Sequence, residues 1–242
     1  MSQADVSGRP SLAEVQSSDD VRAEHVQLMG GDLGAVYYEL WREVSWLHLK
    51  WQRFIALFGG AKGPVDFMNA TAPAFFGEMQ RAMLMDVLLH ISLLTDPPET
   101  GHGQGARPNL TLRLLPGVLP DETLRSIVGS KLEKLGAGCA FARDWRNRWI
   151  AHRDLALSMQ TSPYRSLDSP TREKIEHALA EIRDVMNTVL ARFKESRTLY
   201  EYSLGGPGDA DALVHYLREG LEAHRKQLGE LQGSVRPPSP QG

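Results

Sequence analysis

Apolar residues recur at spacings of three and four along most of this chain, which is the period of an amphipathic α-helix. In the first long run the apolar positions are Tyr37, Leu40, Trp41, Val44, Leu47, Trp51, Phe54 and Ile55. The periodicity predicts helices over about 32–58, 72–95, 120–135, 170–202 and 209–228. No convincing series of strands is found. The pattern therefore predicts an all-α fold, an up-and-down helical bundle with an additional C-terminal helix.

Glycine, proline and capping residues mark where these helices are expected to begin and end. A glycine pair from Gly59 ends the first helix and a proline pair from Pro97 ends the second, because neither residue favours helix continuation. Gly136 allows a break or a bend after the third helix. Ser169 is expected to cap the fourth helix, with Pro170 in its first turn.

The two ends of the chain are polar and poor in apolar residues. We expect disorder over residues 1–18 and 232–242, and a single helical domain over residues 19–231. Within that domain, the segment Glu99–Arg107 contains three glycines and almost no apolar anchor. We therefore expect it to be a mobile loop.

Composition excludes several classes of protein. The chain has 242 residues, a formal net charge of −3 and one cysteine, Cys139. A single cysteine allows neither an intrachain disulfide nor a cysteine-based zinc site, and such usage is typical of a reducing compartment. The charge gives no global case for nucleic-acid binding, so any such case must rest on a local cluster. No signal-peptide core and no run of about 18 apolar residues is found, so we expect a cytoplasmic protein outside the membrane.

One local cluster lies at residues 142–154, which read ARDWRNRWIAHRD. Four arginines surround a single histidine, His152. Two tryptophans and an isoleucine make the segment amphipathic, which favours a helix over about 143–155. Guanidinium groups bind phosphate through paired hydrogen bonds, and an imidazole can move a proton near neutral pH. This combination of residue types suits chemistry on phosphate.

On a regular α-helix these side chains would not converge. Arg148 lies four residues before His152 and shares its face, whereas Asn147 and Arg146 lie five and six residues before it and point away. Two copies facing each other across a two-fold axis, or a bent helix, would bring them together. We therefore expect a symmetric homodimer in which these segments approach each other. The simpler alternative is a surface ion pair between Asp144 and Arg148 beside a packed, structural His152.

Two segments carry a resemblance to a known family. The spacing R-N-x-x-x-A-H-x-D at Arg146–Asp154 resembles the motif of HEPN-domain ribonucleases, in the form found in their abortive-infection branch. The segment RAMLMDVLLHISLLTDPP at Arg81–Pro98 is similar to a helix of that branch that ends in Leu-Thr-Asp. The resemblance covers roughly residues 30–200. It implies a helical bundle of the HEPN type, a homodimer with both motifs at the interface, and RNA cleavage without a metal ion.

The chemistry of such a cleavage suggests a role for each residue. The 2′-hydroxyl attacks the adjacent phosphate, which needs a base, an acid for the leaving oxygen, and cations beside the phosphorane. We expect His152 to act as base or acid, Arg146 to hold the non-bridging oxygens, and Asn147 to orient the phosphate or His152. Arg148 and Asp154 are supporting candidates with equally good explanations on the helix surface. No acidic cluster suggests metal ligands, so no cofactor is expected.

Two features leave the function open. Some HEPN toxins carry a tyrosine two residues after the histidine, which a partner enzyme modifies, and Asp154 occupies that position here. Control by that route is not expected, although an antitoxin or another defence-system protein could still be a partner. Some HEPN domains have also lost activity. The alternatives to a toxin or anti-phage ribonuclease are therefore an inactive helical module that binds RNA or protein, and a plain helical scaffold.

The remaining polar and aromatic candidates are expected to be structural. His90 lies among apolar residues of the 72–95 helix, and Asp96 is expected to terminate that helix before the proline pair. Asp86 and Asp96 could alternatively line a cleft of the bundle. Three residues of the first helix are expected in the core or at a dimer interface rather than as a platform for stacked bases: Trp41, Trp46 and Trp51.

Overall fold

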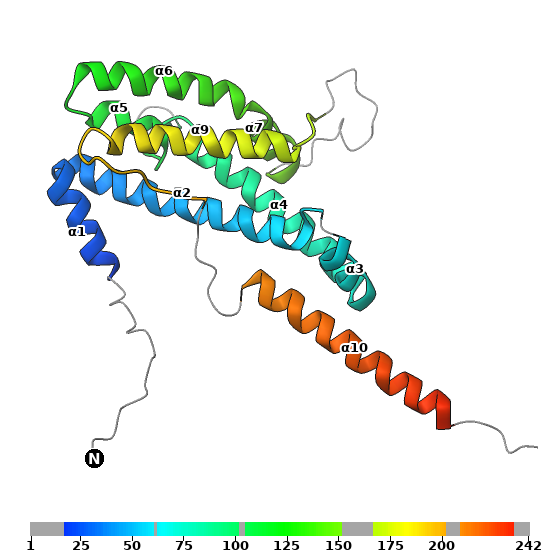
Figure 1. Cartoon of the computed structure of the whole chain (residues 1–242). Coiled ribbons are helices and arrows are strands. Elements are labelled where there is room, and N and C mark those ends of the chain that lie inside the picture. The colour runs from blue at the N-terminus through cyan, green and yellow to red at the C-terminus, as the bar shows by residue number, and fades with distance from the viewer. Residues whose placement is uncertain (1–16, 61, 102–104, 152–166, 202–208, 235–242) are drawn as a thin grey trace, which may run out of the picture.

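The computed structural model describes residues 17–60, 62–101, 105–151, 167–201 and 209–234. Within these residues the chain is almost entirely helical, and the helices pack as a bundle around one apolar core (Figure 1). This arrangement confirms the all-α prediction. None of the described helices is both long enough and apolar enough to cross a membrane.

Two long antiparallel helices form the centre of the bundle. They are α2 (Gly31–Phe58) and α4 (Pro73–Thr95), and they confirm the first two predicted helices. The buried side chains of α2 recur every three or four residues: Leu33, Tyr37, Leu40, Val44, Leu47, Trp51 and Phe54. Each such side chain contributes about 1.5–3 kcal/mol when it leaves water, so this stripe decides which face of α2 is buried.

A second pair of helices, α6 (Glu122–Gly138) and α9 (Arg172–Leu190), packs side by side against the centre. Asp121 caps α6, because its side chain accepts a hydrogen bond of 3.1 Å from the backbone N–H of Leu124. α6 continues through Gly136 and ends two residues later, so the predicted break falls at Cys139.

The prediction for α9 was wrong at both ends. The helix begins after Thr171, whose hydroxyl accepts from the backbone N–H of Lys174, and not after Ser169. It ends at Leu190 and not near residue 202. The amide of Asn187 then binds both backbone groups of Thr198, at 2.8 and 3.1 Å, which holds the returning chain against α9. Side chain to backbone bonds of this kind compete with helix continuation.

Two helices of ten residues or more were not predicted. α1 (Ser18–Met29) begins with a capping box, in which the side chains of Ser17 and Asp20 each bind the other residue's backbone N–H. It packs against α2 at Gly34, where a Cβ atom would overlap the backbone of His25. α3 (Lys62–Thr71) connects α2 to α4. Both helices are short, with twelve and ten residues, so each contains only about three repeats of the helical period.

The segment between α4 and α6 contains short elements. The strands β1 (Glu99–Thr100) and β2 (Arg107–Pro108) form an antiparallel pair. Asn109 closes the base of this hairpin, because its amide binds the Thr100 hydroxyl at 2.6 Å. The predicted mobile loop is thus anchored at its base, while residues 102–104 lie outside the described part, and its mobility stays a prediction. A 3-10 turn, η2 (Leu112–Leu114), and α5 (Leu115–Val118) follow.

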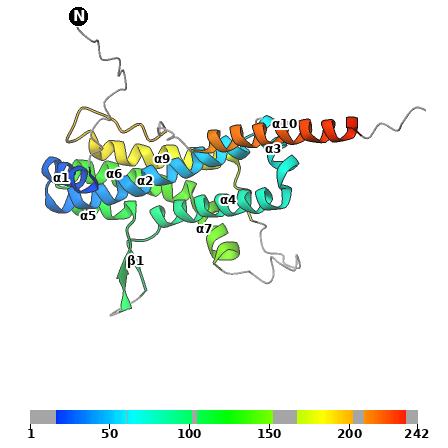
Figure 2. The ribbon, with the colours of Figure 1, turned by 90° about the horizontal axis from the view of Figure 1, so that it is seen from below.

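The predicted C-terminal helix is present as α10 (Ala210–Ser234) and is longer than expected. It begins beside α2, where Asp209 pairs with Arg53 at 2.8 Å, and packs along α3. Figures 1 and 2 both show its far end extending away from the other helices. The chain predicted to be disordered at the two termini lies outside the described residues, apart from Ser17, which caps α1, and Ser18 and residues 232–234, which are helical. The single-domain boundaries stay a prediction.

Candidate functional site

The described part of the arginine-rich segment lies beside the C-terminal end of α4 (Figure 2). It consists of α7 (Ala140–Trp145) followed by a π turn, η3 (Arg146–Ile150). His152 and Asp154 lie outside the described residues. The structure therefore places three of the five predicted site residues, namely Arg146, Asn147 and Arg148.

The prediction of one regular α-helix over residues 143–155 was wrong. From Arg146 the backbone widens, and the N–H of Ala151 binds the carbonyl of Arg146 at 2.8 Å. In a π turn, residues five apart stand on successive turns, and such turns are frequent at functional sites. Residues five apart point away from each other on an α-helix, whereas within this turn they do not.

The Arg146 guanidinium is held at two of its three nitrogens. Its Nη1 donates to a carboxylate oxygen of Asp96, and its Nε donates to the side-chain oxygen of Asn147 at 3.0 Å. The side chain of Arg146 is 23% exposed and that of Asp96 is 14% exposed. Among the described residues no partner of Nη2 is found. The structure thus joins the two segments that carried the family resemblance, through Arg146 and Asp96.

Asp96 has two roles. Its backbone is extended, with φ −67° and ψ 164°, so it terminates α4 as the sequence predicted. Its side chain also binds Arg146 through Oδ2, while Oδ1 is buried without a hydrogen-bond partner in the described part of the chain. A buried acceptor without a donor is unfavourable and is uncommon in folded proteins. The predicted role was therefore incomplete, because sequence position alone could not identify the partner of the carboxylate.

A second arginine of the cluster is used for structure. Arg143 binds the Thr95 hydroxyl at 3.2 Å through Nη1 and the Gly136 carbonyl through Nη2. Arg113 binds the Thr95 carbonyl at 3.1 Å and lies where a Cβ atom on Gly136 would stand. Cations at helix C-termini are favourable, and these two connect the ends of α4 and α6. They hold Thr95 and Gly136 in place, and we call this junction the platform of Asp96.

Arg148 pairs with Asp144 at 3.4 Å, which is the contact that the simpler alternative predicted. The indole N–H of Trp145 binds the carbonyl of Asp168 at 2.8 Å and anchors α7 to the chain before α9. Trp145 and Trp149 meet edge to face, with ring centroids 6.3 Å apart. Arg148 therefore has a structural partner, and a supporting role for it stays a prediction.

The described residues near this site include neither a metal-ligand group nor an exposed thiol. No group of three or more histidine, cysteine, aspartate or glutamate side chains among them could hold a metal ion. Cys139 is buried, and burial raises the pKa of its thiol to about 12, so the reactive thiolate is scarce near neutral pH.

His90 is structural, as expected. Its Nε2 lies 2.9 Å from Glu43, and its Nδ1 lies 3.4 Å from the Lys50 ammonium, which itself pairs with Asp86 at 2.8 Å. Burial is the main cause that lowers the pKa of His90, and Lys50 lowers it further against the opposite effect of Glu43 and Asp86. This histidine is neutral near pH 7 and stands between α2 and α4, apart from Arg146.

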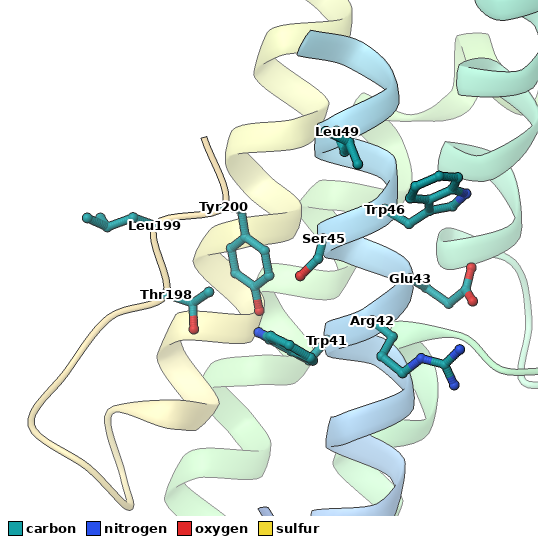
Figure 3. A pocket seen from close by; sticks show the side chains of 9 residues that line it. All are labelled: Trp41, Arg42, Glu43, Ser45, Trp46, Leu49, Thr198, Leu199 and Tyr200. Atoms are coloured by element: carbon teal, nitrogen blue, oxygen red, sulfur yellow. The ribbon is translucent and has the colours of Figure 1, made fainter. Parts of the chain in front are cut away.

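The tryptophans of α2 occupy different environments. Trp51 is in the core, as predicted, whereas Trp46 is 47% exposed and lies under the cations of Lys50 and Arg53. Trp41 lines a groove of about 570 Å³ with Tyr200 and other residues, and Figure 3 shows the hydroxyl end of Tyr200 directed toward the Trp41 ring. The cations near Trp46 pair with acidic residues, so this surface offers little net positive charge to RNA.

Comparison with known proteins supports the resemblance. Residues 31–213 match the family model HEPN_AbiU2, described as AbiU2. No curated protein and no solved structure gives a significant match. The matched range covers most of the chain and contains Arg146, Asn147, Arg148 and Asp96, but it ends near the start of α10.

Proposed function

Because this chain belongs to the HEPN_AbiU2 family, a branch of the HEPN superfamily related to abortive infection, we propose that it is a metal-independent RNA endonuclease. It acts as a toxin or anti-phage effector. The observation that carries the proposal is the Arg146 guanidinium, which is fixed by Asp96 and Asn147 and leaves Nη2 for a phosphate. It stands in the same segment as His152, six residues before it.

The proposed reaction uses these residues in one displacement. A base removes the proton of a 2′-hydroxyl, the 2′-oxygen bonds to the adjacent phosphorus, and the bond from phosphorus to the 5′-oxygen breaks. An acid returns a proton to that oxygen, so the products are a 2′,3′-cyclic phosphate and a 5′-hydroxyl. His152 serves as base or acid, and Arg146 stabilises the charge on the non-bridging oxygens. Asn147 orients Arg146 or the phosphate.

Two copies of the chain divide the acid and base roles in this proposal. The π turn weakens the geometric reason for a dimer, but α4 supplies another. Phe75, Met79 and Leu93 are 58%, 39% and 49% exposed, and their separations of four and fourteen residues are close to whole turns of one helix. Asp86 lies on the same stripe and is paired with Lys50, so the stripe presents mainly apolar side chains, as is typical of an interface position.

Light scattering tests the homodimer. The parent at micromolar concentration should have twice the mass of one chain, and the double variant Phe75→Asp with Leu93→Asp should have the mass of one. A helical circular-dichroism spectrum for the variant would show that it still folds. A parent with the mass of one chain would contradict the homodimer.

The main experiment is incubation of the purified protein with RNA in EDTA. His152→Ala should lower the cleavage rate by about 10²–10⁴, the usual loss for a general acid or base, while RNA binding persists. His177→Ala is the matched control, because His177 is exposed on α9, and it should cleave like the parent. Equal rates for His152→Ala and the parent, or loss of activity in EDTA, would exclude the mechanism.

The second candidate function is an inactive module that binds RNA or a protein, such as a neutralising partner. The favouring observation is that three arginines of the site already have protein partners, as in a purely structural cluster. A parent that binds RNA but never cleaves it would favour this function over the nuclease.

A further inference from the structure

We propose that Asp96 is a positioning residue of this site, which aims the Arg146 guanidinium at the scissile phosphate. The inference rests on the proposed function and adds a residue that the motif at Arg146–Asp154 does not contain. Asp96 stands at the end of α4, fifty positions before Arg146, and does not itself contact the reacting atoms.

The geometry of the guanidinium carries the argument. A guanidinium is planar, so hydrogen bonds at two of its three nitrogens determine where the third one points. Asp96 binds Nη1 and Asn147 binds Nε, and both N–H groups of Nη2 remain without a partner in the described ranges. Asn147 is exposed and adjacent in the chain, so it moves together with Arg146. Asp96 is the contact that ties Arg146 to another element.

The position of Asp96 is itself well defined. On one side, the Thr95 carbonyl binds Arg113 at 3.1 Å and the Thr95 hydroxyl binds Arg143 at 3.2 Å. On the other side, Pro97 restricts the backbone, and its carbonyl binds the Asn109 amide at 3.0 Å. A carboxylate on such a platform can orient a partner side chain, whereas one on a loose loop could not.

The ion pair between Asp96 and Arg146 is shielded from water. Both side chains are less than a quarter exposed, so water competes weakly for the ion pair. The second oxygen, Oδ1, is buried and accepts no hydrogen bond within the described residues. An asparagine at this position would place either an amide N–H against Arg146 or an N–H in a site without an acceptor. The carboxylate therefore fits this position better than its neutral isostere.

Single-turnover cleavage in EDTA tests the inference. Asp96→Asn should lower the maximal rate by about 10- to 100-fold, because a small misplacement of a catalytic group has effects of this size. The protein concentration at half-maximal rate should change little. Asp184→Asn is the matched control, because Asp184 of α9 also pairs with a cation from another helix, Lys131 of α6, and it should behave like the parent.

A double-mutant cycle separates positioning from a general structural effect. If Asp96 acts through Arg146, Asp96→Asn should have no further effect on the rate of an Arg146→Ala protein. A full-sized additional loss in that background would overturn the proposal, and so would an Asp96→Asn protein that cleaves like the parent.

Nuclear magnetic resonance gives a readout that does not need cleavage. Asp96→Asn should shift and broaden the Nε–H signal of Arg146 and leave that of Arg143 unchanged, since Arg143 binds other partners. An unchanged Arg146 signal would refute the positioning role whether or not the parent cleaves RNA. If the Arg146 signal changes in the Asp96→Asn variant but the parent never cleaves RNA, the contact is supported and the nuclease function is rejected.

Discussion

Two carboxylates of the same helix pair with cations from other helices, yet their surroundings differ. In the middle of α4, Asp86 is 50% exposed and pairs with the Lys50 ammonium of α2. At the end of α4, Asp96 is 14% exposed and pairs with the Arg146 guanidinium of the π turn. The comparison shows that opposite charges at short distance do not by themselves identify a functional pair.

The difference lies in the cation and in the solvent. An ammonium is a strongly hydrated point charge with freely rotating donors, and exposed pairs of this kind contribute about 0–1 kcal/mol. A guanidinium is rigid and planar, so a half-buried carboxylate can fix its direction. The pair of Lys50 and Asp86 therefore connects two helices, whereas the pair of Arg146 and Asp96 can control which way a charge points.

The largest expected difference between the two regions is in activity. Arg146→Ala should lower the cleavage rate by about 10²–10³, the usual loss for one group that stabilises developing charge, and should weaken RNA binding. Lys50→Ala should leave both unchanged, because Lys50 stands away from the π turn. Rates and RNA affinity measured on both variants check this. Equal losses would show that the two ion pairs have the same kind of role.

The next difference is in the stability of the platform. Arg143→Ala should lower the free energy of unfolding by about 1.5–3 kcal/mol, because it removes charge-assisted hydrogen bonds to Thr95 and Gly136. Urea denaturation measures this. An exposed arginine such as Arg172, which pairs with Glu176 on the surface of α9, provides the control and should lose less than about 1 kcal/mol. A loss for Arg143→Ala no larger than the control's would show that the platform is not held this way.

Removal of Asp96 or of Asp86 should lower the free energy of unfolding by different amounts. Asp96→Ala leaves Arg146 without its partner in a partly buried position and should cost about 1–3 kcal/mol of unfolding free energy. Asp86→Ala should cost less than about 1 kcal/mol, because the pair is solvated. The same urea experiment compares the two. The reverse order of losses would contradict the contrast between the two environments.

The smallest expected effect is a pH dependence of stability to which buried His90, in the middle of α4, contributes. The pKa of His90 is lowered from its ordinary value of 6.5 by burial and by Lys50. As the pH falls below about 6.5, the unfolded chain takes up a proton that folded His90 resists, so stability decreases. His90→Gln should reduce this acid-induced loss, seen as a flatter plot of unfolding free energy against pH. His48, whose pKa burial lowers to about 4, should preserve part of the slope.

The sequence predicted the elements whose periodicity was strong. α2 and α4 appeared within a residue or two of their predicted ends, because their buried stripes are long and their ends are marked by glycine or proline. α1 and α3 were missed because they are short, with twelve and ten residues, so each contains few repeats of the helical period. The far end of α9 was misplaced because Asn187 binds the backbone of Thr198, which no local pattern reveals.

The candidate site shows the same limit. The spacing of Arg146 and Asn147 identified the segment, but the ideal helical wheel could not anticipate the π turn, which depends on packing against α4. The sequence also indicated Asp96 as a helix terminator, since the proline pair that follows it explains that position locally. Its contact with Arg146 joins residues fifty positions apart, so only the tertiary structure could show it.

The central claim is that this chain cleaves RNA without a metal ion, and the chemistry of the new ends tests it most directly. The parent and His152→Ala should be incubated with a defined RNA in EDTA and the fragments analysed by mass spectrometry. We predict 2′,3′-cyclic phosphate and 5′-hydroxyl ends from the parent and a loss of about 10²–10⁴ in their rate of formation in the variant. Fragments with 5′-phosphate and 3′-hydroxyl ends, or no fragments from the parent, would contradict the account.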